Sequence, residues 1–65
     1  MNQFEYMHRA HKAIAMFAFS RDLIVIRIEI GPTNITVESF RGEYGHSRTD
    51  EFASLEALEK AVYGF

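Results

Sequence analysis

The chain has no cysteine, and it has only one proline and four glycines among its 65 residues. Without cysteine, neither a disulfide nor a thiolate metal cluster can support the fold. A core of this size typically supplies only ~3–5 kcal/mol of net stability, so the hydrophobic 48% of the chain must pack into one core. We therefore expect a single domain, residues 1–65, in a reducing, intracellular compartment.

Long hydrophobic runs are also absent. The longest uncharged apolar run is residues 13–19, AIAMFAF, whereas a helix that spans a bilayer needs roughly 20 residues. The start of the chain, MNQFEYMHRAHK, lacks the basic end followed by an apolar stretch that is typical of a secretory signal. We expect no membrane segment and no membrane partner.

Positive charge is scarce in the second half of the chain. The net charge is −2; residues 1–30 carry four Lys or Arg against three acids, and residues 31–65 carry three against six. Sequence-independent binding to nucleic acid depends on neutralising phosphates with Lys and Arg. We therefore expect no direct nucleic-acid partner, and a protein partner with a basic surface fits the composition better.

Residue patterns that support chemistry are missing as well. His8 and His11 share a face on a helix but not on a strand, and no third ligand stands at a metal-site spacing. His46 precedes Asp50 and Glu51, but the sequence indicates no activated serine or threonine nearby. The remaining carboxylates are interpreted as a solvated acidic face. We therefore expect no catalytic residue, no cofactor and no metal, hence no enzyme.

What the chain does have is a strongly alternating segment, LIVIRIEI, over residues 23–30. Alternation with a period of two is typical of a strand that has one face buried and one exposed. It predicts one face made of Ile24, Ile26, Ile28 and Ile30, and an opposite face made of Leu23, Val25, Arg27 and Glu29. A sheet of this kind packs on one side and offers the other side as a binding surface.

Short turns divide the middle of the chain into strand-like runs. Two short turns, SRD at 20–22 and GPTN at 31–34, separate three apolar runs, AIAMFAF, LIVIRIEI and ITVESF. This order predicts consecutive antiparallel strands. The polar stretch RGEYGHSRTDE at 41–51 is interpreted as a loop or a loosely paired extension. Ser54 is expected to cap a helix from Leu55 to about Gly64, with Leu58 and Val62 on its apolar face.

The first twelve residues fit two periodicities. One interpretation is a strand over 2–8, a bend near Ala10 and a second strand from about 13. The other is a helix whose apolar stripe consists of Phe4, Met7, His11, Ile14 and Ala18. We favour the strands, because four strands match one covering helix. The predicted fold is α+β: about four antiparallel strands in a meander, with a C-terminal helix on one face. The apolar second strand would then contact a partner or lie under the loop 41–53.

Interface-type side chains are the remaining functional signal. Tyr6 and Tyr44 offer rigid contact area with a polar tip, and Arg27 can bind carboxylates or backbone oxygens. Glu29 stands beside Arg27 on the same predicted strand face. These residues are the candidate partner-binding positions.

Four segments, MNQFEYMHRAH, AMFAFSRD, VIRIE and FASLEALEKAVYG, resemble in their order the small phage anti-CRISPR proteins that inhibit the type I-F CRISPR surveillance complex of Pseudomonas. The matching residues are Tyr6, Ala10 and His11 near the start, and Phe52, Ser54, Glu56, Leu58, Glu59, Tyr63 and Gly64 near the end.

The resemblance implies a four-stranded antiparallel sheet with helical cover and a non-enzymatic mechanism in the host bacterial cytoplasm. The inhibitor would dock on the backbone subunits that hold the guide RNA and block target DNA sterically. Tyr6 and Glu29 match a contact tyrosine and a contact glutamate, whereas Ser20 replaces a second contact tyrosine. The turn at 21–22 is shorter than in the family, segment 31–51 is longer, and the family's second helix has no counterpart here. A type I-C or other type I complex is therefore as compatible a target as type I-F.

Two other classes of function stay open. A small homodimeric, antitoxin-like regulator would pair its apolar second strand with a second copy, and the chain would be a monomer or a weak homodimer under either binding hypothesis. A metal-dependent nuclease would need His8, His46 and the carboxylates to converge.

Overall fold

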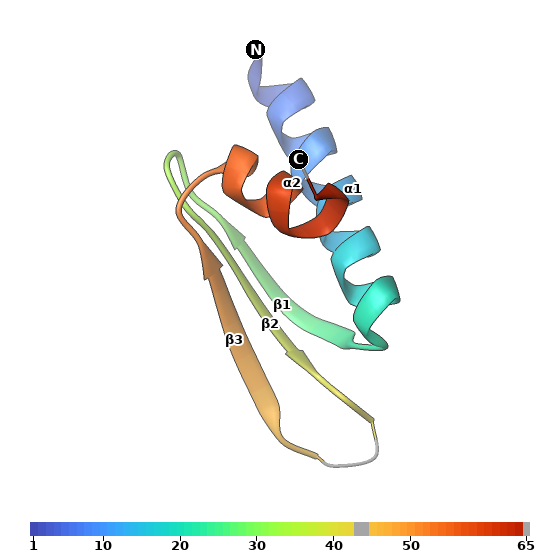
Figure 1. The fold of residues 1–65 in the computed structure, drawn as a ribbon. Helices are drawn as coiled ribbons and strands as arrows, with labels where there is room; N and C mark the ends of the chain where they lie inside the picture. The colour runs from blue at the N-terminus through green and yellow to red at the C-terminus, as the bar shows by residue number, and fades with distance from the viewer. Residues whose placement is uncertain (43–44, 65) are drawn as a thin grey trace.

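The computed structural model describes residues 1–42 and 45–64. Within these residues the chain forms two helices and three strands, in the order α1 (Gln3–Arg21), β1 (Ile24–Ile30), β2 (Ile35–Phe40), β3 (Ser47–Phe52) and α2 (Leu55–Tyr63). One helix precedes the sheet in the sequence and one follows it. Figure 1 shows α1 and α2 lying beside each other along the sheet. The predicted α+β class is confirmed.

The sheet has three strands in the order β1-β2-β3, and both pairs of neighbours are antiparallel. The antiparallel meander is confirmed, but the prediction of about four strands is wrong. The stretch 41–51 was interpreted as a loop or a loosely paired extension; residues 47–52 form β3 and pair with β2 from Ser47 opposite Phe40 to Phe52 opposite Ile35. The segment SRTDEF is too polar to show the hydrophobic alternation of a strand, so its pairing with β2 decides its conformation.

The strands expected over 2–8 and from about 13 are instead one 19-residue helix, α1. The Asn2 side chain caps its first turn, accepting a hydrogen bond from the Glu5 backbone N–H at 2.8 Å. Alanine is the best helix former, and four alanines lie between residues 10 and 18. The helix ends at Asp22, which adopts the left-handed conformation with φ 55°.

The helical alternative for this segment was correct in type, and its predicted apolar face was correct at Ile14 and Ala18 but not at its other three positions. The buried residues of α1 are Ala10, Ala13, Ile14, Phe17 and Ala18, whereas Phe4, Met7 and His11 of the predicted stripe are exposed. Small alanines allow α1 to lie close to its neighbours, so a face rich in alanine becomes the buried one.

The C-terminal helix α2 confirms its prediction. The Ser54 hydroxyl accepts a hydrogen bond from the Ala57 backbone N–H at 3.0 Å, and Gly64 ends the helix with φ 80°. Leu55 and Leu58 are fully buried, and Val62 packs against the core at half burial.

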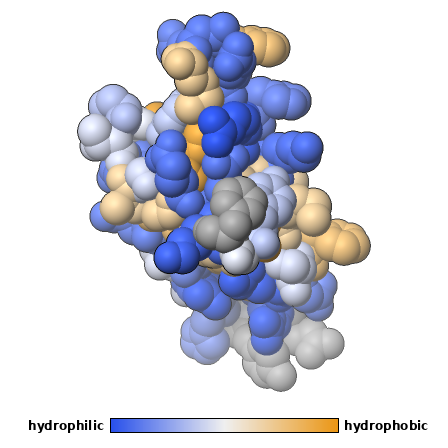
Figure 2. All heavy atoms as spheres, turned by 45° about the horizontal axis from the view of Figure 1, so that its top comes forward, coloured by the Kyte–Doolittle hydropathy of each residue, from blue (hydrophilic) through white to orange (hydrophobic). Residues whose placement is uncertain are grey.

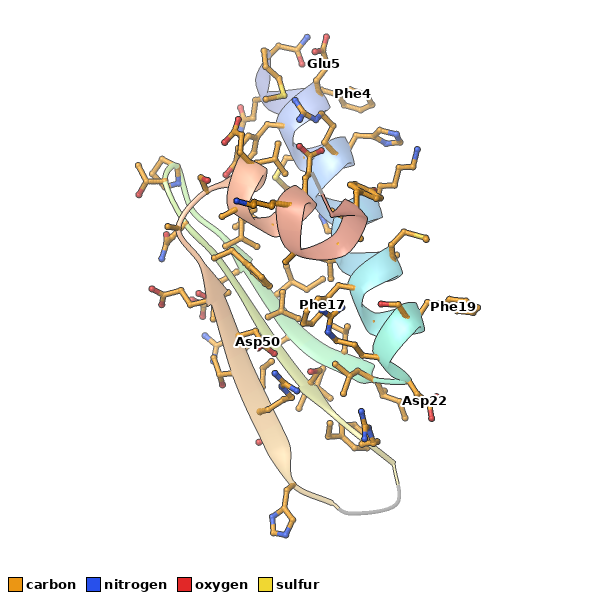
Figure 3. All side chains as sticks on the ribbon, viewed as in Figure 1. Phe4, Glu5, Phe17, Phe19, Asp22 and Asp50 are labelled. Atoms are coloured by element: carbon orange, nitrogen blue, oxygen red, sulfur yellow. The ribbon has the colours of Figure 1, made fainter. Side chains whose placement is uncertain are left out.

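Both helices cover the same face of the sheet. Ala10, Ala13 and Ile14 of α1, Leu55 and Leu58 of α2, and Ile35 and Val37 of β2 form one buried cluster. Phe17 extends the core between α1 and the sheet (Figure 3). Its ring packs edge to face against the ring of Phe52, with 5.5 Å between the two ring centroids. The face of the molecule that Figure 2 shows is mostly hydrophilic, with small separate groups of hydrophobic residues.

A β-bulge in β1 rearranges its predicted faces. The register shifts between Val25, which lies opposite Ser39, and Arg27, which lies opposite Glu38, so Ile26 is the extra residue. Val25, Ile28 and Ile30 pack against the core, whereas Ile24 and Ile26 are each 53% exposed. The expected single isoleucine face is therefore wrong at two of its four positions, because one inserted residue reverses the alternation.

Candidate partner-binding face

The sheet presents one uncovered side, which we call the open face. On β2, Ile35, Val37 and Ser39 are buried beneath the helices, and the alternating Thr36 and Glu38 point to the opposite side. A shallow depression of about 260 Å³ lies there. Its lining residues are Arg27, Glu29, Thr36, Glu38 and Thr49.

An ion pair between Arg27 and Glu29 occupies the β1 side of this face. The two residues are two positions apart on one strand, so both side chains emerge on the same side. Both side chains are more than half exposed, so a partner could displace either group from the pair at small cost. Glu38 is the cross-strand neighbour of Arg27.

The open face carries more negative than positive charge. Glu51 lies opposite Thr36 and shares its side of the sheet, so three carboxylates, Glu29, Glu38 and Glu51, accompany the guanidinium of Arg27 among the described residues of this face. At the far end of β1, Ile24 lies opposite Phe40 and gives the face an apolar border. This arrangement suits a partner surface that is basic and has an apolar margin.

Two of the sequence-derived candidates, Arg27 and Glu29, are together on the open face. Tyr6 lies elsewhere: it is half-buried on α1, packs against the core and donates a hydrogen bond from its hydroxyl to the Gly31 carbonyl at 3.3 Å. Ser20 is exposed near the end of α1, and its hydroxyl donates to the Phe17 carbonyl at 3.1 Å. Tyr44 lies outside the described residues.

A second hollow, of about 350 Å³, lies beside Tyr6. The N-terminal part of α1 and the β1–β2 turn form it, through Gln3, Tyr6, Met7, Ile30, Gly31 and Pro32. Because the Tyr6 hydroxyl is hydrogen-bonded to this turn, the ring joins α1 to the hairpin. The contacts of the Tyr6 ring and hydroxyl are those of a residue that packs the fold together.

Sequence reasoning did not single out three residues that line the depression as partner-binding positions: Thr36, Glu38 and Thr49. The signal for Thr36 and Glu38 was present in ITVESF, where they alternate with Ile35, Val37 and Ser39. Thr49 gave no such signal, because its polar segment has no hydrophobic alternation and was interpreted as a loop or a loosely paired extension.

The other charged pairs lie away from the open face. Arg48 forms two hydrogen bonds to the Asp50 carboxylate at 2.9 and 2.8 Å, which raise the pKa of the Arg48 guanidinium. Both residues are on the side of the sheet that the helices cover, since they lie opposite Ser39 and Val37. Across residues 1–42 and 45–64, no group of three or more His, Asp or Glu side chains is placed to hold a metal ion.

No helix in the described part of the chain has both the length and the apolar character to cross a membrane. In comparisons with known proteins, no family model, no curated protein and no solved structure matches this chain.

Proposed function

We propose that this protein acts without catalysis, by docking the open face of its sheet on a protein partner. The observation that carries the proposal is the exposed Arg27–Glu29 pair at the edge of a shallow, net-acidic depression. A shallow surface with few enclosed groups offers a poor environment for shifting pKa values or excluding water from a reaction. It offers a good surface for a complementary protein.

The resemblance to small phage anti-CRISPR proteins supports the choice of partner. We propose a type I CRISPR surveillance complex in the host bacterial cytoplasm, contacted at the backbone subunits that hold the guide RNA. Proteins that hold nucleic acid carry basic surfaces, and the net-acidic open face is complementary to a surface of that charge. Docking there would block target DNA sterically.

The geometry favours Glu29 and Arg27 over Tyr6 as contacts in this proposal. Glu29 extends from the open face, whereas the ring of Tyr6 packs against the core and its hydroxyl is hydrogen-bonded to Gly31. Tyr6 and Glu29, which the resemblance implies are both contact residues, therefore lie on different surfaces of one copy.

The test is co-elution of the purified chain with purified type I-F and type I-C surveillance complexes, followed by target-DNA binding in the same samples. We expect the wild-type chain to co-elute with one of them and to abolish DNA binding. Glu29→Lys should weaken inhibition at least tenfold, because reversing one charge of a close pair costs more than 1.4 kcal/mol in favourable cases.

Glu56→Lys is the matched control, because Glu56 is exposed on α2 and undergoes the same change of charge. Inhibition that falls equally with both substitutions would indicate a general charge effect and contradict docking by the open face. Failure of the wild-type chain to bind either complex would contradict the proposed target.

A further inference from the structure

Three arginines lie near the C-terminal end of α1, on the side of the sheet that the helices cover. Arg21 is the last residue of α1, Arg41 directly follows β2, and Arg48 lies on β3. The Arg41 guanidinium donates a hydrogen bond to the Arg21 carbonyl at 3.2 Å, so its side chain reaches from the end of β2 to the end of α1. We call these three residues the arginine cluster.

Aromatic packing brings Arg48 to the same region as Arg21. The Arg21 guanidinium carbon lies 4.3 Å from the centre of the Phe17 ring, and the Phe17 ring packs against that of Phe52. Asp50 is two positions before Phe52 on β3 and therefore points to the same side of the sheet. Figure 3 shows Asp50 and Phe17 both lying between β3 and α1. Since Asp50 binds Arg48 through two hydrogen bonds, all three guanidinium groups lie around one part of the covered side.

A buried hydroxyl lies directly beside Arg48. Ser39 of β2 is its cross-strand neighbour, and the Cβ atoms of such neighbours are about 5 Å apart. Ser39 is fully buried, and among the described residues its Oγ has no hydrogen-bond partner. A buried hydroxyl without a partner is rare in native proteins and indicates a bound water or ligand. Because a hydroxyl can donate a hydrogen bond and its neighbour here is a guanidinium, this position favours an anion.

The contacts of the arginine cluster hold the guanidinium groups in place without using all their N–H groups. Within the described part of the chain, Arg48 donates to Asp50 through Nε and Nη2, and its Nη1 is unused. Among the same residues, Arg41 uses only Nη2 and Arg21 uses only Nη1. A guanidinium carries five N–H donors in a fixed plane. The cluster therefore offers several positioned donors to a ligand that has several acceptor oxygens.

The charge of the arginine cluster indicates the class of ligand. Among the described residues, one carboxylate, that of Asp50, is bonded to its three guanidinium groups, and Figure 3 shows the Asp22 side chain pointing away from the sheet. Two positive charges therefore remain in excess. A carboxylate ligand has one charge and two oxygens, which a single arginine satisfies. A phosphate monoester has about 1.5 to 2 negative charges and three acceptor oxygens, which match the cluster better.

We propose that the arginine cluster and Ser39 form a binding site for the phosphate group of a small molecule. The guanidinium N–H groups bind the phosphate oxygens, and the Ser39 hydroxyl donates to the oxygen nearest the sheet. The Phe17 ring, which packs against the Arg21 guanidinium, excludes water from one side of the site and so strengthens these charged hydrogen bonds. A nucleic-acid backbone is a poorer match, because binding to a chain of phosphates requires many cations and the net charge here is −2.

The phosphate site does not rest on the proposed function. It lies on the covered side of the sheet, whereas the proposed partner docks on the open face. Phosphate binding is measured on the purified chain without any surveillance complex, so one proposal can fail while the other holds.

The test is a titration of the isotope-labelled chain with inorganic phosphate, followed by heteronuclear NMR at neutral pH and constant ionic strength. We expect saturable shifts of the Arg21, Ser39 and Arg48 signals, with half-saturation at about 1 mM, as is typical of a partly exposed site with a few hydrogen bonds. Adenosine monophosphate should cause the same shifts, and adenosine, which lacks the phosphate, should cause none of them.

Two substitutions test the assigned residues. Arg41→Gln should weaken phosphate binding at least tenfold, because it removes charge-assisted hydrogen bonds, and the fold should persist because Arg41 is exposed. Lys12→Gln is the matched control, since Lys12 is exposed on α1 and loses the same charge. Ser39→Ala should weaken binding several-fold without lowering the unfolding midpoint, because its hydroxyl has no partner in the described fold. Ser47→Ala, at an exposed serine of β3, should leave binding unchanged.

Three results would overturn the proposal. Shifts that grow without saturation up to about 10 mM phosphate, or an equal effect of Arg41→Gln and Lys12→Gln, would indicate a general charge effect. Unchanged binding by Ser39→Ala would show that the buried hydroxyl is not part of the site. An RNA oligonucleotide that displaces inorganic phosphate more strongly than adenosine monophosphate does would assign the arginine cluster to a nucleic-acid backbone instead of a small molecule.

Discussion

The carboxylate of Glu59 on α2 is buried and accepts two hydrogen bonds from the guanidinium of Arg9 on α1. Arg9 Nε donates to Glu59 Oε2 at 3.1 Å, and Arg9 Nη2 donates to Glu59 Oε1. Glu59 retains only 8% of its exposure, whereas Arg9 is exposed. A buried carboxylate needs such a partner, because an unpaired buried charge is strongly unfavourable. This bidentate pair fixes how the two helices pack.

We predict that Arg9→Ala lowers the urea midpoint of unfolding clearly more than Arg27→Ala. Removing Arg9 leaves Glu59 buried without its guanidinium, whereas removing Arg27 leaves an exposed Glu29 in water. Circular dichroism during urea titration measures both midpoints. Equal midpoints would show that water replaces Arg9 at no cost.

The same pair has a predictable pH dependence. The hydrogen bond to Glu59 raises the pKa of Arg9 above its ordinary value. A raised pKa gives stability that is fully present below the unfolded-state pKa and is lost only as the pH rises through the folded-state pKa. The Arg9 guanidinium should therefore cause no change in stability between about pH 6 and 9. Arg9→Lys is the comparison, because a lysine keeps one charge but not the planar fork. The difference in urea midpoint between wild type and Arg9→Lys should therefore be the same at both ends of this pH range.

Ser39 and Ser54 should respond in opposite ways to the same substitution. Ser39 is fully buried, and among the described residues its Oγ is a buried side-chain polar atom without a hydrogen-bond partner. Ser39→Ala removes this unpaired group and should be neutral or stabilise the fold by up to ~1 kcal/mol. Ser54→Ala removes the cap of α2 and should destabilise it by about 1 kcal/mol. Thermal unfolding measures the stability of both variants. A clear loss of stability in Ser39→Ala would indicate that the Ser39 hydroxyl is hydrogen-bonded to a buried water.

Asp22 and Gly64 end the two helices in the same left-handed region, with φ values of 55° and 80°. A residue with a Cβ is strained there, and glycine is not. Asp22→Gly should raise the free energy of unfolding by up to ~1 kcal/mol, and Gly64→Ala should lower it by about 1 kcal/mol. Chemical denaturation of both variants is the measurement. A loss of stability in Asp22→Gly would show that the aspartate side chain makes a compensating contact.

Two substitutions of Tyr6 distinguish the contribution of its ring packing to stability from the contribution of its hydrogen bond. Tyr6→Phe removes only the 3.3 Å hydrogen bond to Gly31 and should cost less than ~1 kcal/mol. Tyr6→Ala also removes the ring from the core edge and should cost about 2 kcal/mol. If Tyr6→Ala were as stable as wild type, the ring would be free to serve a partner, and its assignment to packing would be wrong.

Local patterns in the sequence were reliable where the packing is local. Ser54 at the start and Gly64 at the end of α2 predicted that helix, since caps act within one turn. The turn residues 31–34 predicted the β1–β2 hairpin for the same reason. Arg27 and Glu29 were correctly placed side by side, because a spacing of two positions on a strand decides which side they share.

Other features depended on pairing between distant segments. Residues 47–52 became β3 only because β2 offered a free edge, and the bulge at Ile26 turned Ile24 and Ile26 to solvent although their alternation was unbroken. Tyr6 and Glu29 looked equivalent as interface residues until α1 replaced the expected strand and brought Tyr6 against Gly31.

The sequence by itself therefore determined the α+β class, the C-terminal helix, the central hairpin and the charged pair on its exposed side, because propensities, caps and turns act over a few residues. The tertiary structure decided the type and buried face of the N-terminal segment, the third strand, the β-bulge and the pairing of Arg9 with Glu59. Each of these features depends on contacts between residues far apart in the chain. Each is the arrangement that lets the whole fold bury its apolar surface and satisfy its polar groups at the same time.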